Sequence, residues 1–370
     1  MSITAPYKAQ ALETVKATHR QEFYAEATTA AGVTHRLQVS DATVSFSEDY
    51  SPRVQAVMSC ANNLAPAVLA ELDPRAGLML GLYAGYVYPG ADADVQLLAR
   101  LFASTRGASQ PGDVLELVGA SAEVRAHEVK WLQAAQVKTF AGVVEAVQWL
   151  ADYSLAPATA ELEATVGAGY RADLVTAVAL EPGLVLWDVM HALTASAGLV
   201  LYVDAAGVWR LEPPATVLGE TAAYLVPGPN STVTKLDDVL SRDGYAEAAL
   251  IRFTWKDANG DREILGTWAP TVAGLAYGAG CKVWESERPG PITQSAANEA
   301  ARLAIVQLST RGNAYVIDAA AHYWLRPGAA VQLMTAEGEV IRHICKTVTF
   351  NIAAGSMTVT TREPNNLGDS

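Results

Sequence analysis

The sequence predicts a mainly β protein in which a small α+β module, residues 136–214, separates two strand-rich regions, residues 1–135 and 215–370. Three observations predict this class. Short runs in which apolar and polar side chains alternate fill both outer regions, and turn signals separate them. Near residue 136 the apolar spacing changes to three and four, the helical period. Many short strands with intervening turns are typical of barrels and sandwiches.

The composition indicates packed domains without a nucleic-acid or membrane signature. The 370 residues are 51% hydrophobic and 18% charged, which suits two or three domains. The net charge is -13, and no cluster of Lys and Arg is present that would neutralise phosphates. The uncharged run 76–91 is shorter than the roughly 20 residues of a membrane span. The N-terminal residues do not form a signal peptide pattern.

The first region begins with an ambiguous segment. Residues 11–27 have a helical composition but a thin apolar stripe, so we expect an arm or helix that docks on this chain or on a partner. Alternating runs then predict strands at 35–39, 42–47 and 54–60 and one or two more within 78–88. A turn signal at 109–113 precedes another predicted strand, 114–118.

The middle region is expected to hold two helices and a hairpin. Apolar residues spaced three and four apart between Phe140 and Leu150 predict the first helix. The second is expected from Leu186 to Ala197, where Gly198 supplies a left-handed stop. The turn signal 204–207 then separates two short strands, and a double proline ends the module.

The third region returns to strands. Two runs flank the hairpin signal 257–261, and a helix is expected at 295–308. Further strands are predicted over 314–325, 330–334, 340–351 and 357–362. No internal repeat of 20 to 50 residues is visible.

Three stretches, in this order, resemble the hub proteins of bacteriophage tails and baseplates, a family that includes the hub of contractile tails and the trimeric spike base of type VI secretion. The stretch similar to their opening barrel comprises Val44 to Phe46, Arg53 to Met58, Pro74 to Gly77 and Gly81 to Gly85. The stretch similar to their middle domain comprises Leu186 to Leu193, Gly198, Asp204, Gly207, Trp209 and Pro213. The stretch similar to their closing segment comprises Ala300 to Arg302, Arg326 to Gly328 and Gly355 to Met357.

The resemblance implies a homotrimer. Each chain would contribute two tail-tube-like β-barrel domains that flank the α+β module, so that six barrels face the sixfold tail tube. Open sheet edges favour such pairing between neighbours, and a closed ring satisfies every edge. Because the chain ends at Ser370 soon after the last predicted strand, another protein is expected to supply any needle, fibre or lytic domain.

The resemblance also implies a location and a set of partners. The protein would be a structural component of the virion at the distal end of the tail, made in the bacterial host cytoplasm, and would form part of the DNA ejection channel. The implied partners are the distal tail or tail tube protein, the C-terminus of the tape measure protein, and a central fibre or spike protein. DNA would pass through the lumen without specific binding, and the net charge predicts an acidic channel wall.

The sequence offers no pattern that predicts a catalytic, cofactor-binding or metal-binding residue. The six histidines lack zinc-ligand spacing, and His191, beside Asp188, is interpreted as a partly buried structural residue. The segment 257–261 lacks the glycine position and terminal glutamate of an EF-hand, so a hairpin turn is favoured over a calcium site.

Acidic pairs, tryptophans and cysteines receive structural interpretations as well. The pairs Asp92/Asp94 and Asp237/Asp238 are interpreted as solvated loop residues. The eight tryptophans are expected in cores or subunit interfaces. The cysteines are interpreted as buried free thiols from a reducing compartment: Cys60, Cys281 and Cys345.

The favoured hypothesis is therefore a structural tail hub without enzymatic activity. One alternative is a tail-associated hydrolase of cell wall or polysaccharide, which needs two carboxylates that converge across a cleft. The other is a carbohydrate-binding receptor module, which needs several exposed tryptophans on one face.

Overall fold

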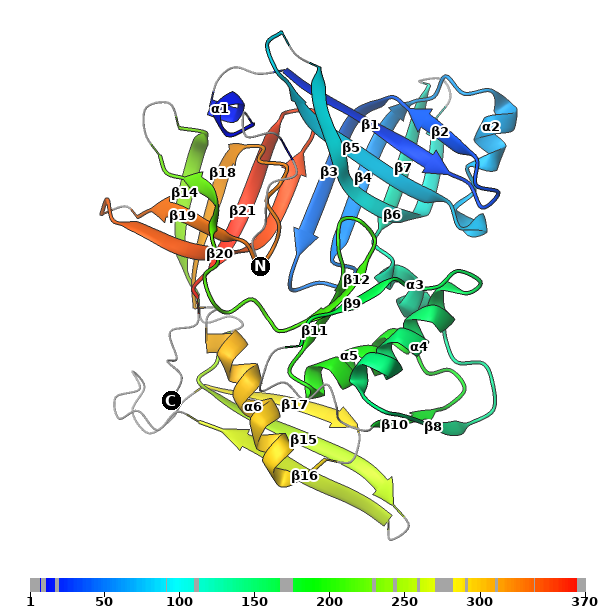
Figure 1. The fold of residues 1–370 in the computed structure, drawn as a ribbon, viewed down its shortest axis with the longest axis vertical. Helices are drawn as coiled ribbons and strands as arrows, with labels where there is room; N and C mark the ends of the chain where they lie inside the picture. The colour runs from blue at the N-terminus through cyan, green and yellow to red at the C-terminus, as the bar shows by residue number, and fades with distance from the viewer. Residues whose placement is uncertain are drawn as a thin grey trace.

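The computed structural model describes residues 7, 11–16, 20–90, 92–109, 113–166, 176–227, 231–241, 245–257, 260–269, 282–289, 292–309, 312–335 and 337–364. Both ends of the sequence contribute to one large sheet, a middle module lies beside it, and a third layer combines a helix with a smaller sheet (Figure 1). The predicted class, mainly β with an α+β insertion, is confirmed. Among the helices of the described residues, none has the length and apolar character needed to cross a bilayer.

The large sheet has thirteen strands, and its path runs β14-β18-β21-β20-β3-β4-β7-β6-β5-β1-β2, with β19 attached to β20 and β13 attached to β19. The strands from the first region are β1 Arg20–Thr28, β2 Thr34–Leu37, β3 Val39–Ser47, β4 Val54–Ala61, β5 Met79–Val87, β6 Ala93–Ser109 and β7 Val114–Ala120. Those from the last region are β13 Thr221–Leu225, β14 Val233–Leu240, β18 Asn313–Ala320, β19 Ala330–Met334, β20 Val340–Asn351 and β21 Ser356–Arg362.

The expectation of two β-barrels needs one correction. The two strand-rich regions join edge to edge where β3 pairs with β20, and within the described residues the path ends at β14 and β2. A closed barrel needs the first and last strands of one region to pair with each other. Here β3 takes a partner from the other region instead, so the result is a continuous sheet.

The ambiguous N-terminal segment divides into a short helix and a strand. Helix α1, Ala11–Lys16, packs on this chain, with Ala11 and Val15 buried in the core of the large sheet. From Arg20 the chain is strand β1, because it pairs with β5 along its whole length and with β2 over its second half. Tertiary pairing thus overrides the helical composition. The helix α2, Pro66–Glu71, and the 3-10 turn η1, Pro74–Ala76, follow β4.

The middle module contains α3 Glu123–Glu128, α4 Val143–Leu155, α5 Leu186–Ser196 and two small sheets. One sheet pairs β8 Gln136–Phe140 with β10 Thr176–Leu180, and the other joins β9 Leu162–Ala164, β12 Trp209–Glu212 and β11 Val200–Val203. Both predicted helices and the predicted hairpin are confirmed. Gly198 and Gly207 have the left-handed φ values, 73° and 87°, that these turns require.

Glu123, the first residue of α3, joins the module to the large sheet. Its side chain is fully buried, and Oε1 accepts hydrogen bonds from the backbone N–H groups of Arg53 (3.2 Å) and Val203 (2.9 Å). Burial disfavours the charged form and raises the pKa of Glu123 above its ordinary value, against the opposing effect of these donors. One carboxylate thus connects the start of β4, α3 and the hairpin strand β11.

We expect Glu123→Gln to remove a pH-dependent part of the stability while keeping an acceptor oxygen for both N–H groups. A carboxyl group whose folded pKa is raised binds more protons in the folded state. The stability of the natural protein therefore falls as pH rises from 4.5, the ordinary value, through the folded pKa. Thermal unfolding across this range measures the effect, with Glu128→Gln at the exposed end of the same helix as control. Parallel pH profiles for Glu123→Gln and the natural protein would contradict this role.

The third layer packs helix α6, Gln294–Leu308, against strands β15 Ala248–Asp257, β16 Gly260–Trp268 and β17 Val283–Pro289. The helix approaches β16 so closely that a Cβ on Gly266 would lie 2.1 Å from the carbonyl oxygen of Ala297, so only glycine fits there. Arg288 donates a 2.8 Å hydrogen bond to the carbonyl oxygen of Ala195, at the C-terminal end of α5. This contact attaches the third layer to the middle module.

Eight consecutive strands of the large sheet, from β14 to β6, are two copies of one four-strand pattern. The set β14-β18-β21-β20 is followed in the sheet by the set β3-β4-β7-β6, and the last two strands along the chain form a hairpin in each set. A register shift occurs at matching places: at Val39/Asp41 in β3 and Val233/Lys235 in β14, and at Ala103/Thr105 in β6 and Cys345/Thr347 in β20.

Hydrogen bonds repeat in the same register. At the first shift, the Ser40 hydroxyl donates to the carbonyl oxygen of Ser59 at 2.9 Å, and the Thr234 hydroxyl donates to that of Asp318 at 3.1 Å. At the second, the N–H groups of Ala103 and Cys345 donate to the carbonyl oxygens of Leu78 and Ala329, at 2.9 and 2.8 Å. The residues that precede β7 and β21 both have positive φ, 48° at Asp113 and 61° at Gly355.

These matches equate the strands residue by residue. Asp41 corresponds to Lys235, Val57 to Val316, Glu116 to Thr358, and Gly107 to Thr349. The loop 48–53 joins β3 to β4, whereas residues 241–312 join β14 to β18 and contain the third layer. The third layer is therefore an insertion in the second copy of the pattern.

Candidate functional surface

The two copies together form one wall with a buried face and an open face. We call it the eight-strand wall: β14, β18, β21, β20, β3, β4, β7 and the C-terminal half of β6, Phe102–Ser109. On the buried face, Met58, Leu117, Ile317 and Phe350 are inaccessible to solvent. On the open face, Val57 retains 53% of its exposure, although it lies on a central strand. Such alternation explains why both regions read as half-buried strands in the sequence.

Short polar side chains cross the open face in one row. Direct cross-strand partners run from Asp318 through Thr358, Thr349 and Ser45 to Gln55. The Thr358 hydroxyl lies 2.6 Å from Asp318 Oδ1, and the hydroxyls of Ser45 and Thr349 are 2.9 Å apart. The second contact crosses the junction between the two copies, so the row is continuous across it.

Charges on the open face are few and mostly negative. At open-face positions of these strands, Asp41, Glu116, Asp237 and Asp318 carry carboxylates and Lys235 carries an ammonium group. The cations of β20 and β21 are engaged at the end of the wall: Lys346 and Arg362 pair with Asp49 and Glu48, and Arg342 donates to the carbonyl oxygen of Gly219. Lys235 forms an ion pair with Asp237, and that hydrogen bond raises the pKa of Lys235. The face therefore carries short polar side chains and more negative than positive charges at these positions. Such a surface repels an anionic polymer and does not bind it.

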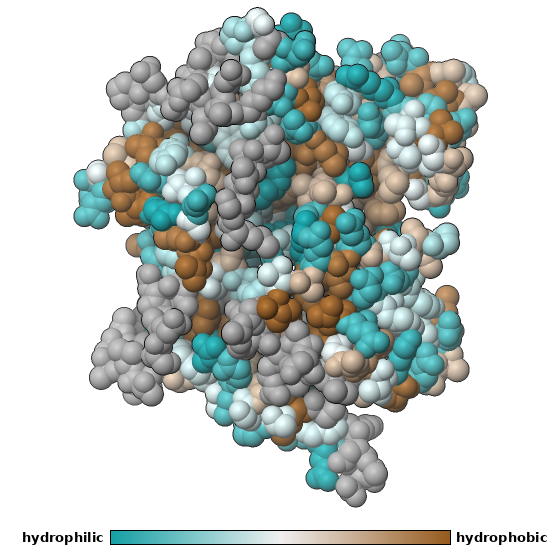
Figure 2. All heavy atoms as spheres, in the orientation of Figure 1, coloured by the Kyte–Doolittle hydropathy of each residue, from teal (hydrophilic) through white to brown (hydrophobic). Residues whose placement is uncertain are grey.

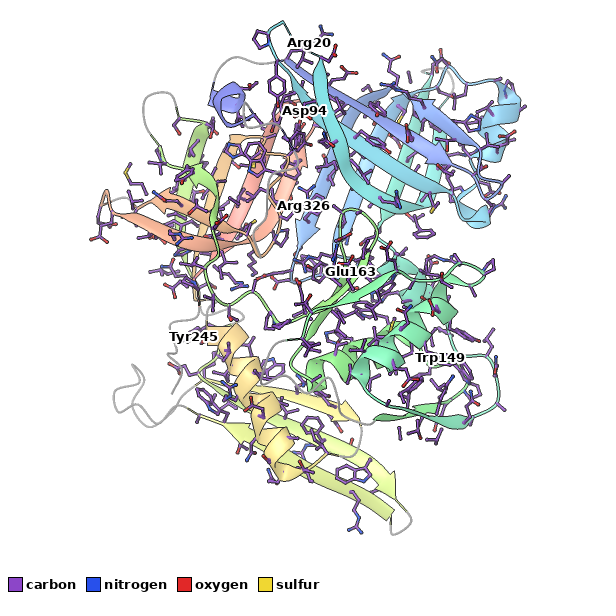
Figure 3. The ribbon with its side chains drawn as sticks, in the orientation of Figure 1. Arg20, Asp94, Trp149, Glu163, Tyr245 and Arg326 are labelled. Carbon is purple, nitrogen blue, oxygen red and sulfur yellow. The ribbon has the colours of Figure 1, made fainter. Side chains whose placement is uncertain are left out.

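Arg326 holds the two copies together at the junction (Figure 3). Its guanidinium donates to the carbonyl oxygens of Tyr323 (2.7 Å), Leu325 (2.8 Å) and Leu98 (3.2 Å), and its central carbon lies 4.4 Å from the ring centre of Phe46. Leu98 is on β6 and Phe46 is on β3, so an arginine of the second copy is embedded in the first. Burial lowers the pKa of Arg326 to about 10. Sequence reasoning left this residue between the predicted strands 314–325 and 330–334 and missed its role.

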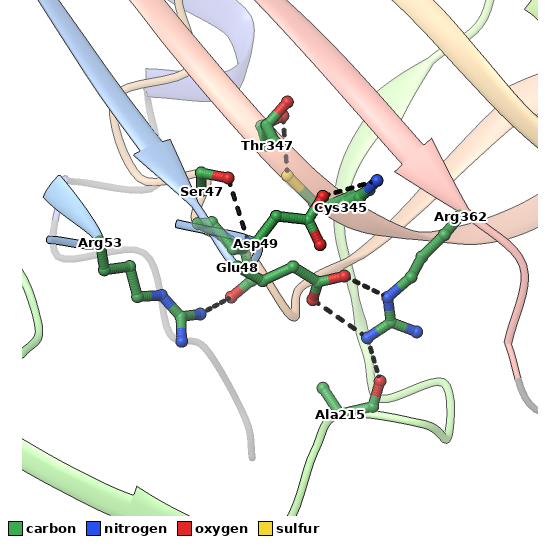
Figure 4. Close-up of polar contacts among 10 residues, drawn as sticks. Ser47, Glu48, Asp49, Arg53, Ala215, Cys345, Thr347 and Arg362 are labelled. Carbon is green, nitrogen blue, oxygen red and sulfur yellow. Dashed lines mark hydrogen bonds and ion pairs between the residues drawn. The ribbon is translucent and has the colours of Figure 1, made fainter. Parts of the chain in front are cut away.

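A second polar cluster closes the end of the β3–β20 junction (Figure 4). Arg362 Nη2 lies 3.1 Å from Glu48 Oε2 and donates to the carbonyl oxygen of Ala215. Lys346 Nζ lies 2.7 Å from Asp49 Oδ2. Both ion pairs join the β3–β4 loop of the first copy to strands of the second, so the internal junction is fixed by charge as well as by backbone pairing.

The two acidic pairs lie far apart in the sheet. Asp94 is buried on β6 and accepts hydrogen bonds from Tyr88 (3.0 Å) and Gln96 (2.8 Å), so its interpretation as a solvated loop residue is wrong. Asp92 is exposed, as expected. Asp237 and Asp238 lie on strand β14 rather than in a loop, and six strands separate β14 from β6 in the sheet order.

Histidines and the hairpin at 257–261 form no recognisable metal site in the described residues. His191 is exposed on α5 rather than partly buried, and its ring centre lies 6.2 Å from that of Trp187. His343 is buried, which lowers its pKa to about 4. The turn residues 258–259 lie outside the described residues, but the flanking strands pair with Asp257 opposite Gly260. In the described ranges, no three His, Cys, Asp or Glu residues are placed to hold a metal ion.

The tryptophans and two of the cysteines lie as predicted. All eight tryptophans belong to the described part of the chain, and each is buried or partly buried. The thiols of Cys60 and Cys345 are free and buried, and burial raises the pKa of Cys60 to about 11. Cys281 lies outside the described residues.

The fold matches known structures although the sequence matches no family model and no curated protein. The tail protein from Neisseria meningitidis MC58 has a TM-score of 0.61 at 13% identity, over 92% of this chain and 96% of that chain. The 43 kDa tail protein of prophage MuSo2 from Shewanella oneidensis has a TM-score of 0.60 at 10% identity, over 92% and 98%.

A third structure extends the likeness beyond prophages. It is an Escherichia coli component of the type VI secretion system that exhibits structural similarity to the T4 bacteriophage tail proteins gp27 and gp5. Its TM-score is 0.51 at 10% identity, over 94% of this chain and 78% of that chain. The chain therefore has the fold of phage tail proteins, as the resemblance in the sequence implied.

Proposed function

We propose that this chain, which has the fold of phage tail proteins, is a structural virion protein of the tail: a homotrimeric hub that joins the tail tube to the distal tip. Three chains would present six copies of the four-strand pattern, which suits contact with a sixfold tube. The open face of the eight-strand wall would line the DNA ejection channel. The observation that carries this proposal is that face. It is continuous across both copies, short polar side chains form its cross-strand row, and carboxylates outnumber ammonium groups at the charged positions described above.

The neighbours of such a hub follow from its place in the particle. The distal tail or tail tube protein would lie on one end of the ring, and a central fibre or spike protein on the other. The C-terminus of the tape measure protein would occupy the lumen before ejection. DNA would then pass without specific binding, because the fixed carboxylates repel its phosphates.

The two alternative functions lack a supporting site in the described residues. A hydrolase needs paired carboxylates, yet Asp94 is committed to internal hydrogen bonds and lies six strands from Asp237. A carbohydrate-binding module needs exposed tryptophans, and all eight are at least partly buried. A structural role without catalysis is therefore the function that the geometry supports best.

Charge reversal on the open face tests the channel. Asp41→Lys, Glu116→Lys and Asp318→Lys together change five charged positions of the face, which include Asp237 and Lys235, from four carboxylates and one ammonium group to one carboxylate and four ammonium groups. We expect the assembled protein to gain salt-dependent affinity for duplex DNA, and particles that carry it to eject DNA more slowly. The matched control changes three exposed acids outside the wall: Glu285→Lys, Glu287→Lys and Glu339→Lys. If both triple variants eject DNA at the natural rate, the open face does not line the channel.

A further inference from the structure

The repeated pattern has one junction inside the chain and two free ends. The last strand of the second copy, β20, pairs with the first strand of the first copy, β3. The strands at the outer ends are the counterparts of these two: β6, the last strand of the first copy, and β14, the first strand of the second. Within the described residues, β14 pairs with β18 alone and residues 105–109 of β6 pair with β7 alone. In Figure 1, β14 lies at the left of the sheet and β7 toward the right.

We propose that β6 of one chain pairs with β14 of a second copy of this chain, in the register of the internal β20–β3 junction. The inference rests on the proposed homotrimer and specifies how its subunits join. The internal pairs are Val348 with Phe46, Thr349 with Ser45, Phe350 with Val44, and Asn351 with Thr43. Their counterparts between subunits are Arg106 with Leu240, Gly107 with Val239, Ala108 with Asp238, and Ser109 with Asp237.

Exposure of apolar residues on β14 supports this pairing. Leu240 is 79% exposed and Val239 is 39% exposed, whereas Phe46, the counterpart of Leu240, is 2% exposed. Phe46 is covered because the junction places it edge-to-face on Phe350, with ring centres 6.1 Å apart. Figure 2 shows hydrophobic residues along the side of the molecule where β14 lies. Leu240 thus occupies a core position of the pattern, and no strand within the described residues covers it.

Charge favours the same pair of strands. In the proposed register, Arg106 of one chain is the diagonal neighbour of Asp238 of the next, on the same face of the sheet. Asp238 is exposed in the single chain. The Arg106 guanidinium donates to the carbonyl oxygen of Leu69, and its planar group carries further donors that can reach a carboxylate. The internal junction is likewise held by ion pairs between its two copies, Glu48 with Arg362 and Asp49 with Lys346.

Backbone geometry decides the kind of assembly. A strand edge with unpaired N–H and carbonyl groups binds another edge strand readily. Because β6 and β14 are different edges, the contact is heterologous and repeats from chain to chain until the ring closes. Since the same register joins the copies within and between chains, the open face would continue around the whole ring, with Gly107 and Val239 at the positions that Thr349 and Ser45 hold in the internal junction.

A disulfide between two introduced cysteines tests the register. The hydroxyls of Ser45 and Thr349 are 2.9 Å apart, so sulfur atoms at the counterpart positions are within bonding range. We expect Gly107→Cys with Val239→Cys, in a Cys281→Ser background, to form covalent dimers and trimers under mild oxidation, and the ladder to stop at three. The control Gly107→Cys with Leu240→Cys places the second thiol on the opposite face and should remain uncrosslinked.

The outcomes separate this inference from the proposed function. Trimers in light scattering that give no crosslink in the test pair, in solution or in assembled particles, would overturn the register and leave the hub intact. A crosslink that appears equally in the control pair would also overturn it. A specific crosslink in a protein that never enters a tail would support the strand pairing and reject the hub. Absence of both trimer and crosslink at every protein concentration, and in particles, would reject both.

Discussion

Arg326→Ala is expected to lower the free energy of unfolding by about 3 to 5 kcal/mol, because it leaves buried carbonyl oxygens without donors and opens a cavity at the junction. The guanidinium donates to Tyr323, Leu325 and Leu98 and stacks over Phe46. Within the described residues, no other side chain at the junction contacts both β3 and β6 of the first copy through a hydrogen bond or a ring. Chemical denaturation followed by tryptophan fluorescence measures the change.

A second substitution separates hydrogen bonding from packing. Burying the charge of Arg326 has a cost of its own, as its pKa of about 10 indicates. Arg326→Met removes that cost and retains most of the volume, so we expect a loss of about 1 to 3 kcal/mol from the carbonyl oxygens alone. Arg75→Ala is the control, since Arg75 is exposed and paired with Asp73 on the surface. Equal unfolding curves for Arg326→Ala and the control would show that the junction does not depend on this group.

Much of the fold follows from local patterns in the sequence. The strands 330–334 and 340–351 were predicted to the residue, because each combines clean alternation with a turn signal at its ends. Helix α5 was predicted within one residue for the same kind of reason, since Gly198 stops it. In residues 20–27 the alternation is weak, and the segment forms a strand because it pairs with β2 and β5. The composition of these residues does not indicate that pairing, so the strand could not be predicted from them.

The duplication could not be found in the sequence, for a physical reason. A half-buried strand needs only an apolar residue at every second position, so matching strands such as β3 and β14 share almost no identical residues. The spacing also differs between copies, because the third layer is inserted between β14 and β18. Only register shifts and the hydrogen bonds around them reveal the match. The open face is formed by the two copies side by side, so its residues can be identified only once the copies are matched. The net charge of the sequence predicted an acidic wall, but not which residues form it.

Leu240→Lys is expected to abolish self-association while leaving the single chain as stable as before. Leu240 is 79% exposed, so a polar side chain there costs the monomer little. In the ring it would bury an ammonium group at the position where Phe46 lies in the internal junction, directly opposite Arg106 of the neighbouring chain, and like charges at that position repel. Loss of a buried leucine and desolvation of the new charge together weaken each interface by about 3 kcal/mol, roughly a hundredfold in the pairwise association constant.

The matched control for Leu240→Lys is Val217→Lys, because Val217 is 78% exposed and lies on neither edge strand. Analytical ultracentrifugation measures association, and thermal unfolding measures the stability of the chain. If both variants associate like the natural protein, β14 is not the edge that joins the subunits. If Leu240→Lys also unfolds at a lower temperature, Leu240 packs within its own chain. Only loss of association with unchanged unfolding, in Leu240→Lys and not in Val217→Lys, fits a ring in which each chain completes the core of the next.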